Sequence, residues 1–522
     1  MKPTLKSILG SIPYTADLYD ALRRGRPRTR YNLEQLQAAL PSAIQQARPY
    51  AEKAPRGKRL LLFATLHYWV EQAAMIGLAL RGLGHDVTVA HLPYGDWRKD
   101  VNDFDLRRQD LYTKRVLKPL SGLVKTASLL DIRPAPVLPA NLREDIHLVS
   151  TYDAQYTLQV EDVDETSDLF RLRLSRNDHA ARAALTLMQA EGPDVVLIPN
   201  GTITELGAVY RAARHLGIRA AVTYEFNDQR EQVWIAQDDE VMRQRTDDLW
   251  AARGGRKLTG EQRRLIEELE SARMGAKAFG KSVRKWQDVE TVGGEQMRRE
   301  LGLDERPVIL LATNVLGDSL TLGRNTFAES MAAWIAETVR FLAGRPGVQL
   351  VMRVHPGERL THGRSMADVV NEALPSIPEH IHVIGPLEKV NTYDLMEIAS
   401  LGLVYTTTTG MEMAMNGIPV IACGETHYRK RGFTYDPDSW DEYYAMLNAA
   451  IEAPKRLTPA QIETAWEYAY RFFFEYPQPF PWRLVHFWKD VEAWPLGRVL
   501  SEEGQAEYKK TFDYLAGEPI RW

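Results

Sequence analysis

Short apolar runs alternate with helical patterns of apolar residues along most of the chain. The first run, at 59–65, predicts a buried strand, a helical pattern follows at 70–80, and a second strand is predicted at 86–90. Two strands joined through a helix form a βαβ unit, whose strands are parallel and whose crossover is right-handed. The same order returns at 194–223, so this part of the chain predicts a doubly wound α/β domain.

A second alternating set begins near residue 306. Its apolar runs predict five strands, at 308–312, 348–352, 381–384, 401–405 and 419–422. Between the two sets, residues 243–300 are rich in charge and helical in pattern, and the residues after 458 are helical and aromatic. The pattern therefore predicts two doubly wound domains, and ligands of such sheets bind beyond the carboxyl ends of the strands, here in a cleft between the domains.

The expected organisation has five segments. They are an N-terminal extension at 1–58, a first Rossmann-like domain at 59–242, a helical connection at 243–305, a second Rossmann-like domain at 306–457 and C-terminal helices at 458–522. Pro477, Pro479 and Pro481 break the last segment, which gives the chain a point at which to change domains.

Charge and cysteine content exclude several classes of protein. The 522 residues include 65 basic and 69 acidic ones, so the net charge of −4 gives no basic field for nucleic acid. The single cysteine, Cys423, excludes an internal disulfide and a cysteine-cluster metal site. No run approaches the ~18 apolar residues of a membrane span. We expect a cytoplasmic protein, and a basic segment at 24–28 leaves peripheral contact with the membrane open.

The most informative segment for chemistry is 401–437. A predicted strand there runs into Thr407, Thr408, Thr409 and Gly410, and then into a short helix that carries Glu412. Hydroxyls, backbone N–H groups and a helix N-terminus suit a phosphate or diphosphate, and an acidic residue suits the hydroxyls of a ribose. The alternative is a threonine-rich helix cap beside a surface glutamate.

Arg353 and His355 form a second candidate site at the carboxyl end of the strand predicted at 348–352. Pro356 disfavours a helix there and holds His355 on an extended turn. Either side chain can donate a hydrogen bond to a phosphate oxygen. The alternative for His355 is a structural role in the loop.

Taken in their order along the chain, residues 353–356 and then 401–437, the two segments resemble the donor-binding half of a GT-B glycosyltransferase. More narrowly, they resemble the bacterial capsule polysaccharide biosynthesis family, which includes the Kdo-transferase-like enzymes. The matching motifs are His355-Pro356, then Thr407-Thr408-Thr409-Gly410-Met411-Glu412, Gly417-Ile418-Pro419-Val420, and Gly424 with Tyr428 and Gly432-Phe433-Thr434. Met413 stands where the family has alanine, and threonines replace its usual serine.

The resemblance implies a GT-B fold, with two Rossmann-like domains facing a cleft and C-terminal helices that cross back to the first domain. It implies that the second domain binds a nucleotide-sugar donor and the first domain a glycan or glycolipid acceptor. Glu412 would bind the nucleotide ribose. His355 and the threonines with Gly410 would hold the donor phosphates, with Arg353 and Tyr428 in the same site. No cofactor or metal is expected, and the transfer is expected to invert the anomeric carbon.

Two residues are candidates for the catalytic base. His67 follows the first predicted strand, where some inverting GT-B enzymes have a histidine, and Glu225 follows the strand predicted at 219–223. An imidazole or a carboxylate there can deprotonate an acceptor hydroxyl. The alternative for His67 is a residue that only begins a helix, and the choice between the two bases stays open.

The predicted function is transfer of a sugar from a nucleotide-sugar to a glycan or glycolipid in bacterial surface polysaccharide synthesis. One alternative is a non-hydrolysing UDP-sugar 2-epimerase, although that family has a Ser-Gly-Gly phosphate loop that this chain lacks. The other is a catalytically silent GT-B scaffold, since a fold does not establish an activity. The sequence leaves the donor base, the sugar, the acceptor and the oligomeric state open.

Overall fold

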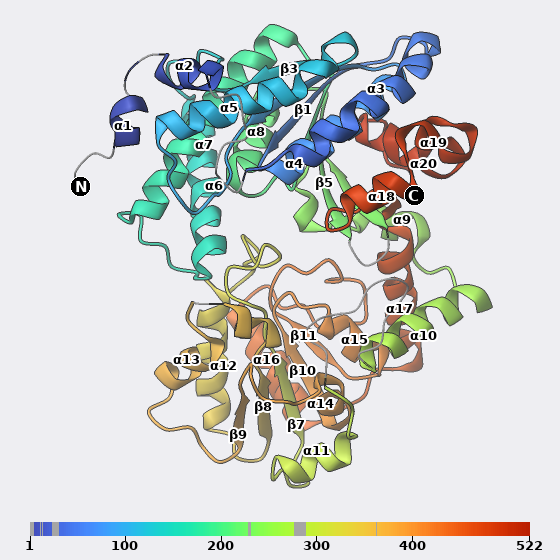
Figure 1. The fold of residues 1–522 in the computed structure, drawn as a ribbon. Helices are drawn as coiled ribbons and strands as arrows, with labels where there is room; N and C mark the ends of the chain where they lie inside the picture. The colour runs from blue at the N-terminus through green and yellow to red at the C-terminus, as the bar shows by residue number, and fades with distance from the viewer. Residues whose placement is uncertain are drawn as a thin grey trace. The chain divides into compact units, whose positions relative to one another are not determined.

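The computed structural model of the chain describes residues 5–10, 12, 14–22, 31–227, 231–275, 289–361 and 363–522. The chain forms two compact units, each with its own sheet and its own apolar core (Figure 1). The first unit comprises Met1–Asp153, Asp164–Gln244 and Pro477–Arg521, and the second comprises Ala154–Val163, Arg245–Tyr476 and Trp522. The prediction of two doubly wound α/β units is confirmed.

The first unit contains a seven-stranded sheet in the order β12-β6-β5-β4-β1-β2-β3. Its strands are β1 (Arg59–Thr65), β2 (Asp86–Leu92), β3 (Lys125–Ser128), β4 (Val195–Pro199), β5 (Ala220–Asn227), β6 (Gln232–Gln237) and β12 (Gln478–Pro479). The strands β1 to β5 are parallel, and β6 runs antiparallel to β5. Helices cover both faces of a parallel sheet, which explains why β1 and β4 are almost continuously apolar.

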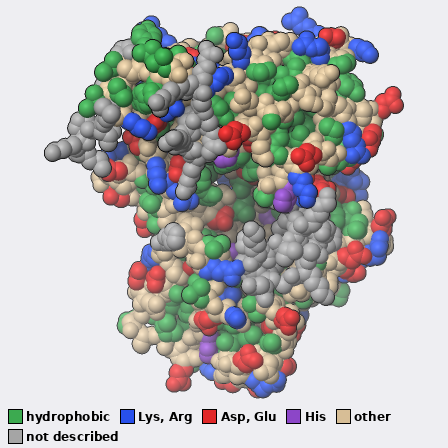
Figure 2. Space-filling model, viewed as in Figure 1, with side chains coloured by type: hydrophobic (Ala, Val, Ile, Leu, Met, Phe, Trp, Pro, Cys, Tyr) green, Lys and Arg blue, Asp and Glu red, His purple; other side chains and the backbone are tan. Residues whose placement is uncertain are grey.

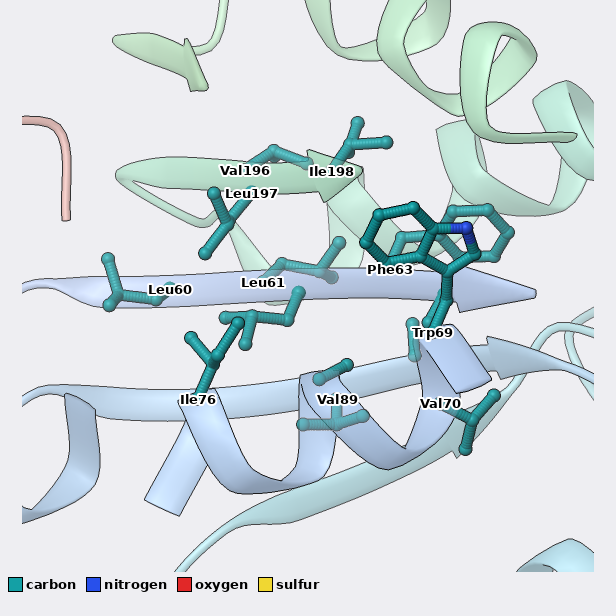
Figure 3. Close-up of a cluster of buried hydrophobic side chains, with 14 of the residues drawn as sticks. Leu60, Leu61, Phe63, Trp69, Val70, Ile76, Val89, Val196, Leu197 and Ile198 are labelled. Atoms are coloured by element: carbon teal, nitrogen blue, oxygen red, sulfur yellow. The ribbon is translucent and has the colours of Figure 1, made fainter. Parts of the chain in front are cut away.

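The helices of the first unit pack on this sheet or on one another. They are α1 (Leu5–Gly10), α2 (Thr15–Leu22), α3 (Glu34–Lys53), α4 (His67–Gly82), α5 (Asp103–Leu117), most of α6 (Ala140–Leu158), α7 (Asp168–Glu191), α8 (Thr204–His215), α18 (Phe487–Ala493), α19 (Leu496–Leu500) and α20 (Glu502–Leu515). Figure 3 shows Trp69 and Ile76 of α4 beside the apolar side chains of β1. A Cβ on Gly77 of α4 would lie 3.1 Å from Val89 Cγ2, so this helix lies close against the sheet.

Part of the expected N-terminal extension belongs to the core of the first unit. Helix α3 packs on α4 and buries Leu36, Leu40 and Ala43. The helix contains Pro41 and Pro49, and its buried stripe is rich in alanine. Both features weaken the periodic signal from which a helix is predicted.

The second unit contains a five-stranded parallel sheet in the order β11-β10-β7-β8-β9. Its strands are β7 (Val308–Ala312), β8 (Gln349–Arg353), β9 (Ile381–Ile384), β10 (Ala399–Val404) and β11 (Val420–Ala422). Its helices are α9 (Asp247–Arg253), α10 (Gly260–Met274), α11 (Gly294–Glu300), α12 (Met331–Ala343), α13 (Met366–Ala373), α14 (Thr392–Ile398), α15 (Thr409–Met415), α16 (Trp440–Glu452) and α17 (Pro459–Tyr470). All five predicted strands are present.

The predicted return of the C-terminal helices to the first unit is confirmed. Strand β12 pairs with β6, and Trp488 Nε1 donates a hydrogen bond to Glu71 Oε2 on α4 at 3.1 Å. The return begins at Pro477, later than the expected boundary at 458. Helix α17 belongs to the second unit instead, where Trp466 Nε1 donates to Met415 O at 2.9 Å.

On the face that Figure 2 shows, basic and acidic side chains are interspersed. Large exposed apolar side chains gather on and between α1 and α2, namely Ile8, Ile12, Tyr14, Leu18 and Leu22. The basic segment at 24–28 lies outside the described residues. Within the described residues, no helix has both the length and the hydropathy to cross a bilayer.

Candidate functional site

The threonine loop (residues 406–410) follows β10 in the second unit. Thr407 Oγ1 and Thr409 Oγ1 lie 3.1 Å apart, and Tyr428 Oη donates a hydrogen bond to Thr407 O at 2.7 Å. Thr408 occupies the N-cap position of α15, but its side chain makes no capping hydrogen bond. The structure therefore brings the predicted threonines, Gly410 and Tyr428 together. Thr407 Oγ1 accepts a long hydrogen bond from the N–H of Thr409, the first residue of α15, at 3.4 Å, so a helix-capping role for the threonines stays open.

Gly410 is required by the packing of this loop. A Cβ at that position would lie 2.4 Å from Tyr428 Oη and 2.8 Å from Val404 Cγ2. Contacts this short are not tolerated without movement of the loop, and overpacking of this kind destabilises a protein. The loop conformation thus depends on Tyr428 and Gly410 together.

Glu412 is buried on α15 and is 2% exposed. Its Oε1 accepts a hydrogen bond from Nη2 of Arg273 on α10, and its Oε2 accepts one from Tyr393 Oη at 3.1 Å. The alternative of a surface glutamate is wrong. Both carboxylate oxygens are engaged by side chains of the same unit, and ribose binding by Glu412 stays a prediction.

The ends of three neighbouring strands are tied to one another by hydrogen bonds. Asn314 follows β7, and its Oδ1 accepts a hydrogen bond from the backbone N–H of Thr406 at 3.1 Å. Thr313 Oγ1 accepts one from the N–H of His355 at 3.0 Å. Because β7 lies between β10 and β8, the turn after β7 connects the threonine loop with the turn that carries His355.

His355 caps the 3₁₀ turn Pro356–Leu360 after β8. Its Nδ1 accepts a hydrogen bond from the N–H of Gly357 at 3.0 Å. A neutral ring whose Nδ1 accepts carries its proton on Nε2. His355 is therefore held in the tautomer that can donate from Nε2.

Arg353 is buried at the end of β8 and holds the backbone of a neighbouring loop. Its guanidinium donates to Gly385 O at 2.6 Å and to the carbonyl oxygens of Glu388 and Val390, each at 3.3 Å. Burial lowers the pKa of Arg353. These contacts give the side chain a structural role, and its expected contact with a phosphate stays a prediction.

In the first unit, His67 is the first residue of α4, directly after β1. The preceding Leu66 has φ 64° and ψ 144°, a region that residues other than glycine rarely adopt and that is enriched at functional sites. Burial lowers the pKa of His67 below its usual value of 6.5, so the ring is neutral at pH 7. Nδ1 of His67 has no hydrogen-bond partner among the described residues.

Glu225, near the end of β5, is held by the turn after β4. Asn200 Nδ2 donates a hydrogen bond to Glu225 Oε2 at 3.2 Å, and Glu225 Oε1 accepts one from the N–H of Phe226 at 3.1 Å. Asn200 is itself fixed, because its Oδ1 accepts from the N–H of Thr202. Since β5, β4 and β1 are neighbours, Glu225, Asn200 and His67 lie at the same edge of the sheet.

A buried ionic network supports the turn after β4. Arg173 is fully buried and pairs with Asp153 Oδ2 and Glu205 Oε1, each at 3.0 Å. Asp153 Oδ1 also accepts a hydrogen bond from the N–H of Thr204, which begins α8 with φ 59°. The charges are paired, as burial requires, and they fix the start of α8 beside Asn200.

Arg273, Tyr393 and Asn314 are site residues that the sequence analysis missed. Arg273 lies in a charge-rich helical segment, so its local sequence predicts an exposed side chain. One signal was available, because Ile266, Leu269 and Arg273 follow helical spacing and so lie on the same face of α10. An arginine at a position of the apolar stripe indicates a buried, paired charge.

Comparisons with known proteins give one family and several solved structures of similar fold. The family model described as "Capsule polysaccharide biosynthesis protein" matches residues 270–470. No curated protein matches the chain in sequence. Within the described residues, no group of three or more His, Cys, Asp or Glu side chains is arranged to hold a metal ion.

Three solved structures illustrate the likeness of fold. The beta Kdo 2,4 transferase of KpsC from Thermosulfurimonas dismutans is 18% identical, over 53% of this chain and 80% of that one, with a TM-score of 0.34. A UDP-GlcNAc 2-epimerase from Neisseria meningitidis is 13% identical, over 80% and 99%, with a TM-score of 0.25. A glycosyltransferase from Rickettsia africae is 7% identical, over 89% and 100%, with a TM-score of 0.27.

At these identities and TM-scores, the solved structures say nothing about the chemistry of this chain. The family match is different, because it falls on the second unit and covers the threonine loop, Glu412, His355 and Arg273. Residues 270–470 therefore resemble the capsule polysaccharide biosynthesis protein family, and the motifs between His355 and Thr434 that predicted this resemblance lie inside the matched region.

Proposed function

We propose that the chain transfers a sugar from a nucleotide-sugar donor to a hydroxyl of a glycan or glycolipid in the synthesis of a bacterial surface polysaccharide. The observation that carries the proposal is the family match over residues 270–470. That region contains the threonine loop, which offers hydroxyls and backbone N–H groups beside a buried arginine. Such a set of groups suits the phosphates of a nucleotide.

In the proposed donor site, the threonine loop and Nε2 of His355 donate hydrogen bonds to phosphate oxygens. Tyr428 acts on the loop, because its hydroxyl holds the carbonyl of Thr407. Donors that are fixed before the reaction stabilise charge on the departing nucleotide without reorganisation. Transfer without a bound metal ion is part of the proposal.

In the proposed reaction, the acceptor oxygen forms a bond to the anomeric carbon while the bond from that carbon to the phosphate oxygen breaks. The electron pair leaves on the phosphate, and a base takes the hydroxyl proton, so the anomeric carbon is inverted. We assign the base to His67, because its ring is neutral and its Nδ1 is unpartnered among the described residues. Both oxygens of Glu225 already accept hydrogen bonds.

Nucleotide binding tests the proposal. In a thermal-shift panel of UDP, CDP, GDP and CMP, one nucleotide is expected to raise Tm, because a ligand at about 100 times its Kd adds ~2.7 kcal/mol to the free energy of unfolding. The double variant Thr407→Val/Thr409→Val removes two loop hydroxyls and is expected to lose that shift. Thr464→Val, at a partly exposed position of α17 in the same unit, is the control and is expected to keep it.

A flat panel on folded wild-type protein would contradict the proposal and favour a silent scaffold. A UDP-sugar that is converted to its 2-epimer in the absence of any acceptor would favour the epimerase. Both outcomes are read from the same purified protein.

The proposal includes a cytoplasmic location and contact with the inner face of the cell membrane, where a lipid-linked acceptor is held. The exposed apolar side chains of α1 and α2 support it, and so does the basic segment at 24–28 in the sequence. Apolar side chains beside basic residues are the usual composition of a segment that lies on an anionic membrane.

Binding to vesicles tests this contact. Wild-type protein is expected to float with phosphatidylglycerol vesicles, and Leu18→Glu/Leu22→Glu is expected to reduce binding at least tenfold, since burying one leucine contributes about 1.5–3 kcal/mol. Leu387→Glu is the control, because Leu387 is 80% exposed and belongs to the second unit. Equal flotation of all three proteins would contradict the contact.

A further inference from the structure

Arg273 is a buried guanidinium at the threonine loop with hydrogen-bonding capacity to spare. It is 5% exposed and lies near the end of α10. Its Nη2 donates to Glu412 Oε1 and lies 3.4 Å from Thr408 Oγ1. Its Nε and Nη1 have no hydrogen-bond partner among the described residues.

The surroundings of Arg273 keep it charged and in place. Burial alone would lower its pKa, but the charge of Glu412 raises the pKa above the usual value. The ring of Phe473 lies 5.0 Å from the guanidinium, a distance at which the cation and the ring attract each other. Glu270, one turn earlier on α10, adds a second acidic group.

Nε and Nη1 are the two unusual atoms in this arrangement. Buried N–H groups almost always have partners, and an unpartnered one on a charged group is especially unfavourable. Neutralising Glu412 through Nη2 does not explain why two further buried N–H donors of the same guanidinium have no partner among the described residues. An arginine offers several N–H donors in a fixed fork, which matches the oxygens of a phosphate.

The hydrogen-bond partners of Glu412 indicate that this carboxylate holds Arg273 in place. One carboxylate oxygen holds Arg273 and the other accepts from Tyr393 Oη. The carboxylate is thus engaged from two sides before any nucleotide binds. Its direct neighbour in the site is the guanidinium, which in turn touches the loop at Thr408.

We propose that Arg273 binds a phosphate of the nucleotide-sugar donor through one of its unpartnered N–H groups, on Nε or on Nη1, and that Glu412 is a positioning residue that holds this guanidinium at the threonine loop. This inference rests on the proposed function. It differs from the expectation that Glu412 binds the ribose, because it makes the contribution of Glu412 depend on the phosphate and on Arg273.

The test compares nucleotides with the matching nucleosides by isothermal titration. UDP, CDP, GDP and CMP, and then uridine, cytidine and guanosine, are titrated into wild type, Arg273→Gln, Glu412→Gln and Arg264→Gln. For the nucleotide that binds wild type, Arg273→Gln and Glu412→Gln are each expected to raise Kd by about 10- to 100-fold, the effect of losing a charged hydrogen bond. Their affinity for the nucleoside is expected to stay within about twofold of wild type, since nucleosides lack the phosphate that Arg273 binds.

Two of the variants are controls, one for the loss of a charge on α10 and one for misfolding of a single variant. Arg264→Gln removes a charge from an exposed position of the same helix and is expected to bind as wild type does. The double variant Arg273→Gln/Glu412→Gln removes both members of the buried ion pair together, so it is expected to fold even if a single variant does not. Its nucleotide affinity is expected to equal that of a single variant, because both residues act through one contact.

The possible outcomes separate the two proposals. Equal loss of nucleotide and nucleoside affinity in Glu412→Gln would overturn the inference and favour ribose binding by Glu412. Unchanged nucleotide affinity in the folded double variant would also overturn it. If no nucleotide binds wild type, the proposed function itself fails, and the inference falls with it.

Discussion

A protein with His67 replaced by glutamine is expected to transfer sugar about 10²- to 10⁴-fold more slowly than wild type, which is the usual contribution of a general base. Donor binding is expected to be unchanged, because the proposed donor residues belong to the second unit. The pH dependence of kcat/KM shows in which protonation state His67 acts. A base acts while it is neutral, and burial lowers the pKa of His67 below 6.5. Wild-type kcat/KM is therefore expected to fall only as the pH drops below 6.5.

The matched control for this variant is His85→Gln. Burial also lowers the pKa of His85, but this histidine lies directly before β2, at the other edge of the sheet, where it accepts a hydrogen bond from the N–H of Lys58. His85→Gln is expected to keep both the rate and the acid limb. If His67→Gln kept the wild-type rate while Glu225→Gln lost it, the base would be Glu225.

Replacement of Gly410 by alanine is expected to disrupt the threonine loop. The added Cβ would lie 2.4 Å from Tyr428 Oη and 2.8 Å from Val404 Cγ2. Overpacking of a well-packed site lowers the free energy of unfolding by about 1–3 kcal/mol, and we expect nucleotide binding to weaken at least tenfold because the loop must move. Thermal unfolding and titration with the bound nucleotide measure the two effects.

Two other variants show whether the cause is the one proposed. Gly347→Ala adds a Cβ in the same unit where nothing lies within 4 Å, and it is expected to bind nucleotide as wild type does. Gly410→Ala/Val404→Ala keeps the Tyr428 hydroxyl but removes the Val404 Cγ2 that the new Cβ would meet, so part of the binding is expected to return. Wild-type nucleotide binding by Gly410→Ala would contradict the account of the loop.

The parallel strands were predictable because their signal is local. Strands β7 and β8 are buried along their whole length. Strand β7 is an uninterrupted apolar run, and β8 contains the apolar run Leu350-Val351-Met352, so a search for short apolar runs detects both. Strand β6 alternates between buried and partly exposed positions at the antiparallel side of its sheet, and β12 has two residues and includes a proline. Strands this short or mixed give no signal that separates them from loops.

The site was predictable only where its residues are close in sequence. The threonine loop and Glu412 follow one strand, and their composition points to phosphate chemistry without any fold. Arg273 is 139 residues away from Glu412, and no local pattern connects the two. The hydrogen bonds of Arg353 could not be predicted from the sequence either. Their acceptors are the carbonyl oxygens of residues 385, 388 and 390, which follow another strand.

Acceptor-dependent release of nucleotide by the purified protein decides whether this chain is a glycosyltransferase. The nucleotide-sugar matching the nucleotide that raises Tm is incubated, in buffer with EDTA, with a glycolipid extract of a capsule-producing bacterium. If the chain is a glycosyltransferase, we expect free nucleotide and acceptor-linked sugar to appear in equal amounts, and only when the acceptor is present. A nucleotide-sugar that stays intact with every acceptor, or that changes to its epimer without one, would contradict it.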